Sequence, residues 1–81
     1  MVRVARVRLD SIGADLEIPP GAALISINGK ELRDSLDLLF FEADAEVHLE
    51  TRLPSGESVV YEIEKHPDEP LGLIPEPDKV R

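Results

Sequence analysis

The segment IPPGAALISING, at residues 18–29, constrains the fold more than any other part of the chain. Its two prolines and first glycine end whatever precedes them, because proline cannot continue a hydrogen-bond ladder and disfavours helix in the residue before it. The apolar run at residues 24–27 has no polar face to expose, which predicts a central strand. Asn28 and Gly29 supply the positive-φ pair of a tight hairpin turn. We therefore expect a buried strand that ends in a hairpin, with the other elements packed around it.

Composition bounds the class of protein. The 81 residues make one domain, near the size at which a single core begins to suffice without disulfides or metals. There is no cysteine, so the chain contains no disulfide, thiolate nucleophile or cysteine metal site, which fits a reducing compartment. The net charge of -8 has the wrong sign for nucleic acid or an anionic membrane. No apolar run approaches the roughly 18 residues that span a bilayer. We expect a cytoplasmic domain with no nucleic-acid or membrane partner.

The N-terminal region predicts a strand with an irregularity. The apolar positions of residues 2–9 change phase by one residue, from Val2 and Val4 to Ala5, Val7 and Leu9. Such a slip within a strand predicts a bulge or a bend. Ser11 then offers the N-cap of a short helix.

A second helix is expected after the hairpin and a brief return strand at residues 30–32. Asp34 offers an N-cap, and the helix would run from about residue 35 to about residue 42. One helical face holds four apolar residues at the spacing i, i+3, i+4 and i+7, namely Leu36, Leu39, Phe40 and Ala43. We expect most of this face to lie in the core. Leu38 and Phe41 lie off it, and are either covered by another segment of the domain or exposed for a partner.

The second half of the chain predicts a hairpin followed by a loop. Residues 46–53 alternate, with Val47, Leu49 and Thr51 on one side, which is typical of a half-buried strand. Residues 54–57 form a reversal, and residues 58–64 mirror the alternation, so the two strands should pair as an antiparallel hairpin. From residue 66 onward, four prolines surround one short apolar insert, residues 71–74.

The order of these elements resembles a PDZ domain over nearly the whole chain, with its first elements moved to the end. The residues that carry the resemblance are Pro20-Gly21, the strand ending Ile27-Asn28-Gly29, and the Leu71-Gly72-Leu73 insert after the last long strand. This arrangement is the circular permutation usual in bacterial PDZ-like domains. It implies a β-rich α+β fold, a five- or six-stranded partly open barrel or sandwich with two helices, over residues 1–75. Residues 76–81 would be a charged tail or linker towards a missing downstream domain.

A closer resemblance is to bacterial proteins in which such a module heads the chain and a cysteine-rich, radical-SAM-like iron–sulfur domain follows. The shared pattern is Pro-Pro-Gly, Ile-Asn-Gly, Asp-Ser-Leu-Asp, Glu-Lys and Leu-Gly-Leu, between about residues 4 and 73. One departure is Gly21-Ala22, where that family usually has Gly-Asp. By this resemblance the chain is an N-terminal module without catalysis of its own.

The PDZ resemblance implies a peptide-binding site. Backbone N–H groups of the loop would receive a terminal carboxylate, and the following strand would add the peptide beside the second helix. The implied site residues are Leu71, Gly72, Leu73, Ile74, Leu36, Leu39 and Phe40. The plainer interpretation is that Leu71 and Leu73 anchor the last strand. Pro75 removes one ladder donor, and the net charge disfavours a carboxylate, although Lys65 could compensate locally.

Three functional hypotheses remain open from the sequence. The first is a non-catalytic interaction module that positions or regulates a fused or partner protein, with a protein, a C-terminal peptide or its own downstream domain as partner. The second is a surface that contributes to the active site of a larger iron–sulfur enzyme. The third is a structural adaptor whose groove is closed. No catalytic residue, metal site or cofactor is expected, because His48 and His66 have no converging third ligand and no calcium-loop pattern is present.

Overall fold

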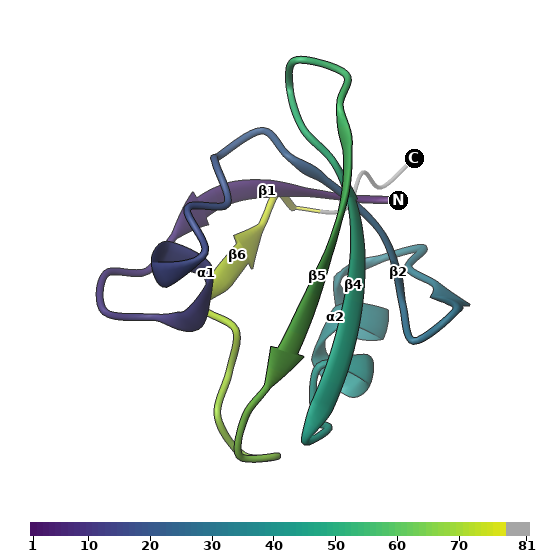
Figure 1. The fold of residues 1–81 in the computed structure, drawn as a ribbon. Coiled ribbons are helices and arrows are strands. Elements are labelled where there is room, and N and C mark those ends of the chain that lie inside the picture. The colour runs from purple at the N-terminus through teal and green to yellow at the C-terminus, as the bar shows by residue number, and fades with distance from the viewer. Residues whose placement is uncertain (78–81) are drawn as a thin grey trace.

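The computed structural model describes residues 1–77, which form a small, β-rich α+β domain (Figure 1). This range contains six strands and two short helices, in the order β1 (Val2–Val7), α1 (Ile12–Asp15), β2 (Ala23–Ile27), β3 (Lys30–Glu31), α2 (Ser35–Phe41), β4 (Glu46–Arg52), β5 (Ser58–Glu64) and β6 (Leu73–Pro75). The predicted β-rich α+β class is confirmed. Residues 78–81, most of the predicted charged tail, lie outside the described residues.

The strands form one open antiparallel sheet in the order β5-β4-β2-β1-β6, with β3 paired to β2 beside this path. β5 and β6 are therefore the two ends of the sheet. Figure 1 shows the β4–β5 hairpin in teal and green, with its loop projecting beyond the rest of the domain. The predicted pairing of these two strands is confirmed over seven residue pairs, from Glu46 opposite Glu64 to Arg52 opposite Ser58.

β2 is the central strand that the sequence predicts, because it pairs with β1, β3 and β4. The turn after it has φ values of 52° at Asn28 and 81° at Gly29, as a tight hairpin requires. The Asn28 side chain also joins this turn to β4. Its Nδ2 donates to the Glu46 carbonyl at 3.0 Å, and its Oδ1 accepts from the His48 N–H at 2.8 Å. Asn28 therefore fixes both the hairpin and the register of the next strand.

β1 is irregular at the place that the phase slip predicts. Its pairing with β6 shifts register between Val4 and Arg6. The first half of β1 pairs with β2 and the second half pairs with β6, so this single strand connects the two halves of the sheet. The predicted end of the strand is wrong, because β1 stops at Val7 and Leu9 is 90% exposed. The chain turns away at Asp10, whose φ is 56°.

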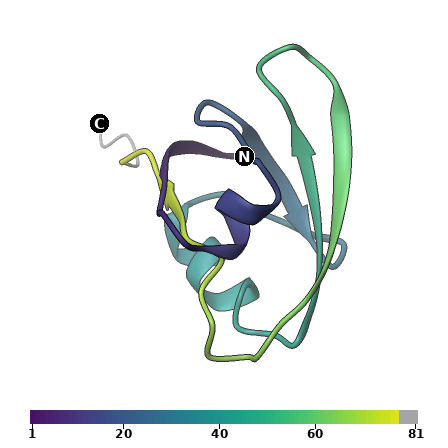
Figure 2. The same ribbon diagram turned by 60° about the vertical axis from the view of Figure 1, so that its left-hand side comes forward.

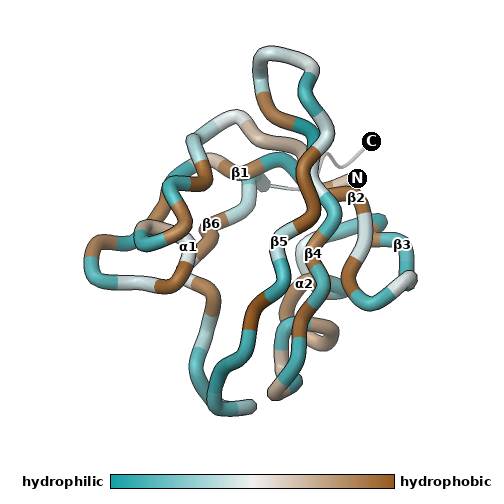
Figure 3. Tube along the Cα trace, in the orientation of Figure 1, coloured by the Kyte–Doolittle hydropathy of each residue, from teal (hydrophilic) through white to brown (hydrophobic). Residues whose placement is uncertain are grey.

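The core lies against the inner face of the sheet and is almost entirely aliphatic. Along β4 buried and exposed residues alternate strictly, and Figure 3 shows hydrophobic and hydrophilic residues alternating along the same strand. Val47, Leu49 and Thr51 are the buried members, as predicted. The Thr51 hydroxyl donates to the Val59 carbonyl at 2.9 Å, so this buried polar group is satisfied by the neighbouring strand.

The predicted core face of α2 is wrong. Leu38 is only 2% exposed and Phe41 packs against the core, whereas Leu36, Leu39 and Phe40 are 57%, 64% and 68% exposed. Five of the seven residues of α2 are large and apolar, so two different faces of the helix can bury apolar surface. Leu38 and Phe41, which are three residues apart, are the pair that reaches the core. The larger apolar set of the helix, with the spacing i, i+3 and i+4, therefore faces outward. The same helix therefore presents an apolar surface to solvent.

Both helices begin with the caps that the sequence predicts. Ser11 Oγ accepts from the Ala14 N–H at 3.1 Å, and Asp34 Oδ1 accepts from the Asp37 N–H at 3.0 Å. The Asp37 carboxylate in turn accepts from the Arg33 N–H at 3.0 Å. Each cap satisfies amide donors that have no partner within the helix.

Asp34→Ala is expected to destabilise the domain by about 1 kcal/mol, because the first turn of α2 loses its acceptor. Asp34→Asn is the matched control, since asparagine caps about as well as aspartate but carries no charge. Urea unfolding followed by circular dichroism measures both. Equal losses in the two variants would show that the carboxylate charge, and not the hydrogen bond, is what matters at this position.

Candidate functional site

A shallow groove lies between the edge strand β6 and the helix α2. In Figure 2 β6 is the yellow strand and α2 is a teal helix. The groove has a volume of about 300 Å³, and we call it the β6–α2 groove. It is lined by Arg8, Leu39, Glu42, Pro70, Gly72, Leu73, Ile74 and Pro75. The prediction that the segment after Leu73 lies beside the helix that begins at Ser35 is therefore confirmed.

The structure brings together four of the seven predicted site residues. Leu39, Gly72, Leu73 and Ile74 line the β6–α2 groove. Leu71 as a whole residue is 1% exposed and belongs to the core, and its N–H is bonded to Glu42, so it does not line the groove. Leu36 and Phe40 do not line the groove, but both are exposed on α2, and Leu36 lies one turn before Leu39. The outer face of α2 thus extends the apolar wall of the groove.

The loop at the start of β6 is held from behind by α1 and the end of β1. The Gly13 N–H donates to the Leu71 carbonyl and the Arg8 N–H donates to the Gly72 carbonyl, each at 2.8 Å. α1 approaches so closely that a Cβ on Gly13 would lie 2.6 Å from Leu73 Cδ2. Gly72 has a φ of 78°, which turns the backbone at this point. The loop is therefore packed against α1 and the end of β1.

One backbone donor of this loop meets a carboxylate of the same chain. The Leu71 N–H donates to Glu42 Oε1 at 2.9 Å, and Glu42 is the C-cap residue of α2. Sequence patterns did not identify Glu42 or Arg8 as site residues. Lys65, expected as a local counter-charge, instead donates to the carbonyls of His66 and Pro67. Arg8 is the cation that lines the groove.

One edge of β6 pairs with no other strand, although Leu73 on that edge is only 6% exposed. β6 is at one end of the sheet and pairs only with β1. In an antiparallel pair, N–H and C=O groups point alternately towards the partner strand and away from it. Because Gly72 and Ile74 are the residues turned towards β1, the N–H and C=O of Leu73 face away from it. The next residue that faces away is Pro75, which has no N–H, so an added strand would find few donors.

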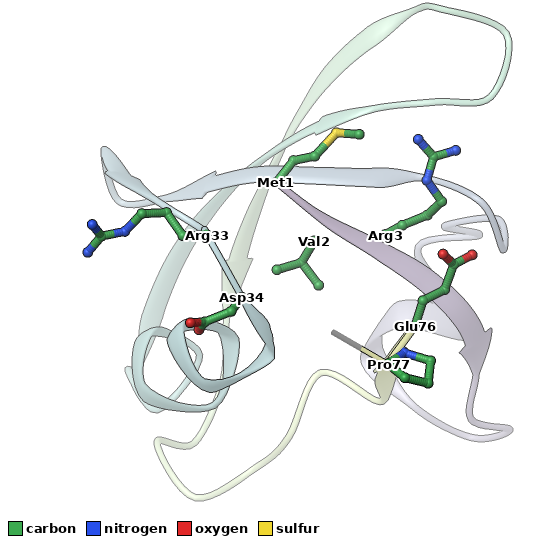
Figure 4. Close-up of a pocket in the computed structure, with 7 residues that line it drawn as sticks. All are labelled: Met1, Val2, Arg3, Arg33, Asp34, Glu76 and Pro77. Carbon is green, nitrogen blue, oxygen red and sulfur yellow. The ribbon is translucent and has the colours of Figure 1, made fainter. Parts of the chain in front are cut away.

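A second, polar hollow lies at the other end of α2, with a volume of about 550 Å³ (Figure 4). Figure 4 shows Arg33 and Asp34 on one side of it and Glu76 and Pro77 on the other, with Val2 between them. The Glu76 N–H donates to the Arg3 carbonyl at 2.8 Å, so pairing with β1 continues just beyond β6. α2 and β6 therefore run in opposite directions, with Glu42 bonded to Leu71 at one end and with Asp34 and Glu76 lining the same hollow at the other.

Both histidines lie outside any cluster of metal-ligating side chains in the described residues. His48 is exposed on β4, and His66 Nδ1 lies 3.9 Å from Asp68 Oδ2 with both side chains largely exposed. Within residues 1–77 there is no group of three or more His, Cys, Asp or Glu residues placed to hold a metal ion. Within the same range, neither helix has the length and apolar character needed to cross a bilayer.

No family model matches this chain, and neither does any curated protein or solved structure. The functional argument therefore rests on the β6–α2 groove, on the backbone groups that border it and on the charges around it.

Proposed function

We propose that this domain is a non-catalytic interaction module that binds an extended protein segment in the β6–α2 groove. The observation that carries the proposal is the juxtaposition of a free sheet edge and an apolar helix face. Strand addition uses such an edge for main-chain hydrogen bonds and the neighbouring surface for side-chain selection. The order of elements, which resembles that of a circularly permuted PDZ-like domain, supports the same mode of binding.

The exposed apolar residues of α2 would supply the apolar contacts that contribute to the binding free energy of the ligand. Leu36, Leu39 and Phe40 lie within five residues of one helix, and each is more than half exposed. Single exposed apolar side chains are ordinary, but a contiguous group beside a groove is typical of an interaction surface. A ligand side chain that covers Leu39 would bury apolar area worth about 25 cal/mol per Å².

The partner in this proposal is a protein, either separate or joined to the chain. The resemblance to modules that precede an iron–sulfur domain suggests such a domain as a partner, which the module would position or regulate. Because Pro75 shortens the usable edge of β6, we expect weak binding, with a Kd on the order of tens of micromolar or weaker. Weak affinity suits a partner held nearby by the chain itself, since linkage raises its effective concentration.

The test uses a panel of individually synthesised short peptides, each made both with a free C-terminal carboxylate and with a C-terminal carboxamide. Each peptide is titrated separately to millimolar concentration against ¹⁵N-labelled protein. The expected result is a set of amide shift changes concentrated in residues 71–75 and in α2. Absence of shifts with every peptide would overturn the proposal and favour an adaptor whose groove is closed.

Leu39→Ser is expected to weaken binding of the tightest-binding peptide of this panel by about tenfold or more, because the ligand loses its apolar contact in the groove. Val60→Ser is the matched control. Val60 is 60% exposed on β5, at the opposite end of the sheet, and does not line the groove. Equal loss of affinity in the two variants would place the binding surface elsewhere. Isothermal titration calorimetry measures both affinities.

A further inference from the structure

The Glu42 side chain occupies the place at which a ligand carboxylate would meet this loop. Its Oε1 accepts from the Leu71 N–H at 2.9 Å, across 29 positions of sequence. Glu42 also lines the β6–α2 groove, and it is partly buried there. The loop thus already holds an acidic group, supplied by the end of the helix that forms the other wall.

We propose that Glu42 makes the β6–α2 groove selective for an internal segment of a protein, and against a C-terminal carboxylate. The occupant is an extended chain that continues past the loop and presents a peptide N–H where a chain end would present a charged oxygen. This inference rests on the proposed function, because it specifies which ligand the same groove takes.

The hydrogen-bonding inventory supports this selectivity. An ionised carboxylate can only accept hydrogen bonds, so Glu42 and a terminal carboxylate cannot bond to each other. A continuing chain, or a carboxamide, offers an N–H that can donate to Glu42. Carboxylates are also strong acceptors for amide donors, so a ligand carboxylate would have to displace Glu42 from Leu71 and leave it without that partner.

Electrostatic repulsion also disfavours a C-terminal carboxylate in the groove. A terminal carboxylate bound at this loop would lie within a few ångströms of Glu42, and like charges at that separation repel. The domain as a whole carries a net charge of -8, which adds to the repulsion. Arg8 lines the same groove and attracts anions, but its side chain is exposed, so solvent weakens that attraction. The bonded carboxylate beside the loop therefore has the larger influence.

The test compares one peptide sequence in two forms. The tightest-binding sequence of the peptide panel is taken with a free C-terminal carboxylate and as the carboxamide, and each form is titrated by calorimetry and by amide shifts. We expect the carboxamide to bind the wild-type domain at least tenfold more tightly. In Glu42→Gln, whose amide can accept from Leu71 and also donate to a ligand oxygen, the preference should fall to about threefold or less.

Glu69→Gln is the matched control. Glu69 lines the hollow next to the groove together with Glu42, but its exposed side chain does not bond to Leu71. The Glu69→Gln variant should keep the tenfold preference for the carboxamide, because only the overall charge of the domain changes. If the wild-type domain binds the carboxylate form as tightly as the carboxamide or more tightly, the selectivity proposal is wrong and the interaction module stands. If neither form binds, the proposed function is wrong and the selectivity fails with it.

Discussion

Leu38→Ala is expected to destabilise the domain by about 2–4 kcal/mol, because it removes a fully buried side chain and leaves a cavity beneath α2. Leu38 is 2% exposed and belongs to the single aliphatic core. A domain of this length has a free energy of unfolding of only about 4–12 kcal/mol, so the loss is a large share of the total. Urea unfolding followed by circular dichroism gives the value.

Leu39→Ala is the control for that measurement, since it makes the same chemical change one residue along the same helix. Leu39 is 64% exposed, and alanine is at least as good a helix former as leucine. We expect a change within about 0.5 kcal/mol. Comparable losses at the two positions, or a larger loss at Leu39, would contradict the orientation of α2 and with it the apolar wall of the groove.

The helix face shows why sequence periodicity failed at this element. α2 has seven residues, so each face offers only two to four positions, and five of the seven are large and apolar. Over three or four turns, apolar residues at i, i+3, i+4 and i+7 normally identify the buried face of a helix. Over the two turns of α2, Leu38 and Phe41 form a second apolar face that can be buried instead. The side that packs inward is decided by how the chain enters from the buried Leu32 and leaves towards β4, which are tertiary constraints. Local pattern cannot supply them.

Where local chemistry specifies a unique backbone, the sequence predicted the structure well. Asn28 and Gly29 adopt positive φ, Ser11 and Asp34 cap their helices, and the strict alternation of β4 is reproduced by its burial. Each of these features depends on neighbours within a few residues. A strand with one polar and one apolar face has only one way to bury the apolar one.

The groove was predicted incompletely, for the same reason. The loop at Leu71 and the edge strand after it were identified from a local motif, whereas Glu42 was not. The bond between Glu42 and the Leu71 N–H joins residues 29 apart, and no spacing rule links a helix C-cap to a distant loop. In the sequence, Glu42 stands out only as an acidic residue one helical turn after Leu39. Its importance depends on how α2 and β6 are placed against each other.

Gly72→Ala is expected to destabilise the domain by about 2–4 kcal/mol, through two additive effects. The φ of 78° costs an alanine about 1 kcal/mol, because Cβ crowds the backbone in the left-handed region. The new Cβ would also overlap the Ser11 side chain, with Oγ only 2.5 Å away. Ser11 cannot easily move, because its hydroxyl donates to the Arg8 carbonyl at 2.7 Å and accepts from the Ala14 N–H. Thermal and urea unfolding measure the loss.

Gly29→Ala separates the two effects. Gly29 has nearly the same φ, 81°, but no atom lies within 4 Å of the position that its Cβ would take. It should therefore lose only about 1 kcal/mol, the backbone term alone. In a Ser11→Gly background, where the obstructing side chain is gone and glycine still caps with a loss of a few tenths of a kcal/mol, Gly72→Ala should fall to the cost of Gly29→Ala. If Gly72→Ala costs as much in that background as in the wild type, α1 does not pack against the loop as described, and the rigid support that we assign to the groove is absent.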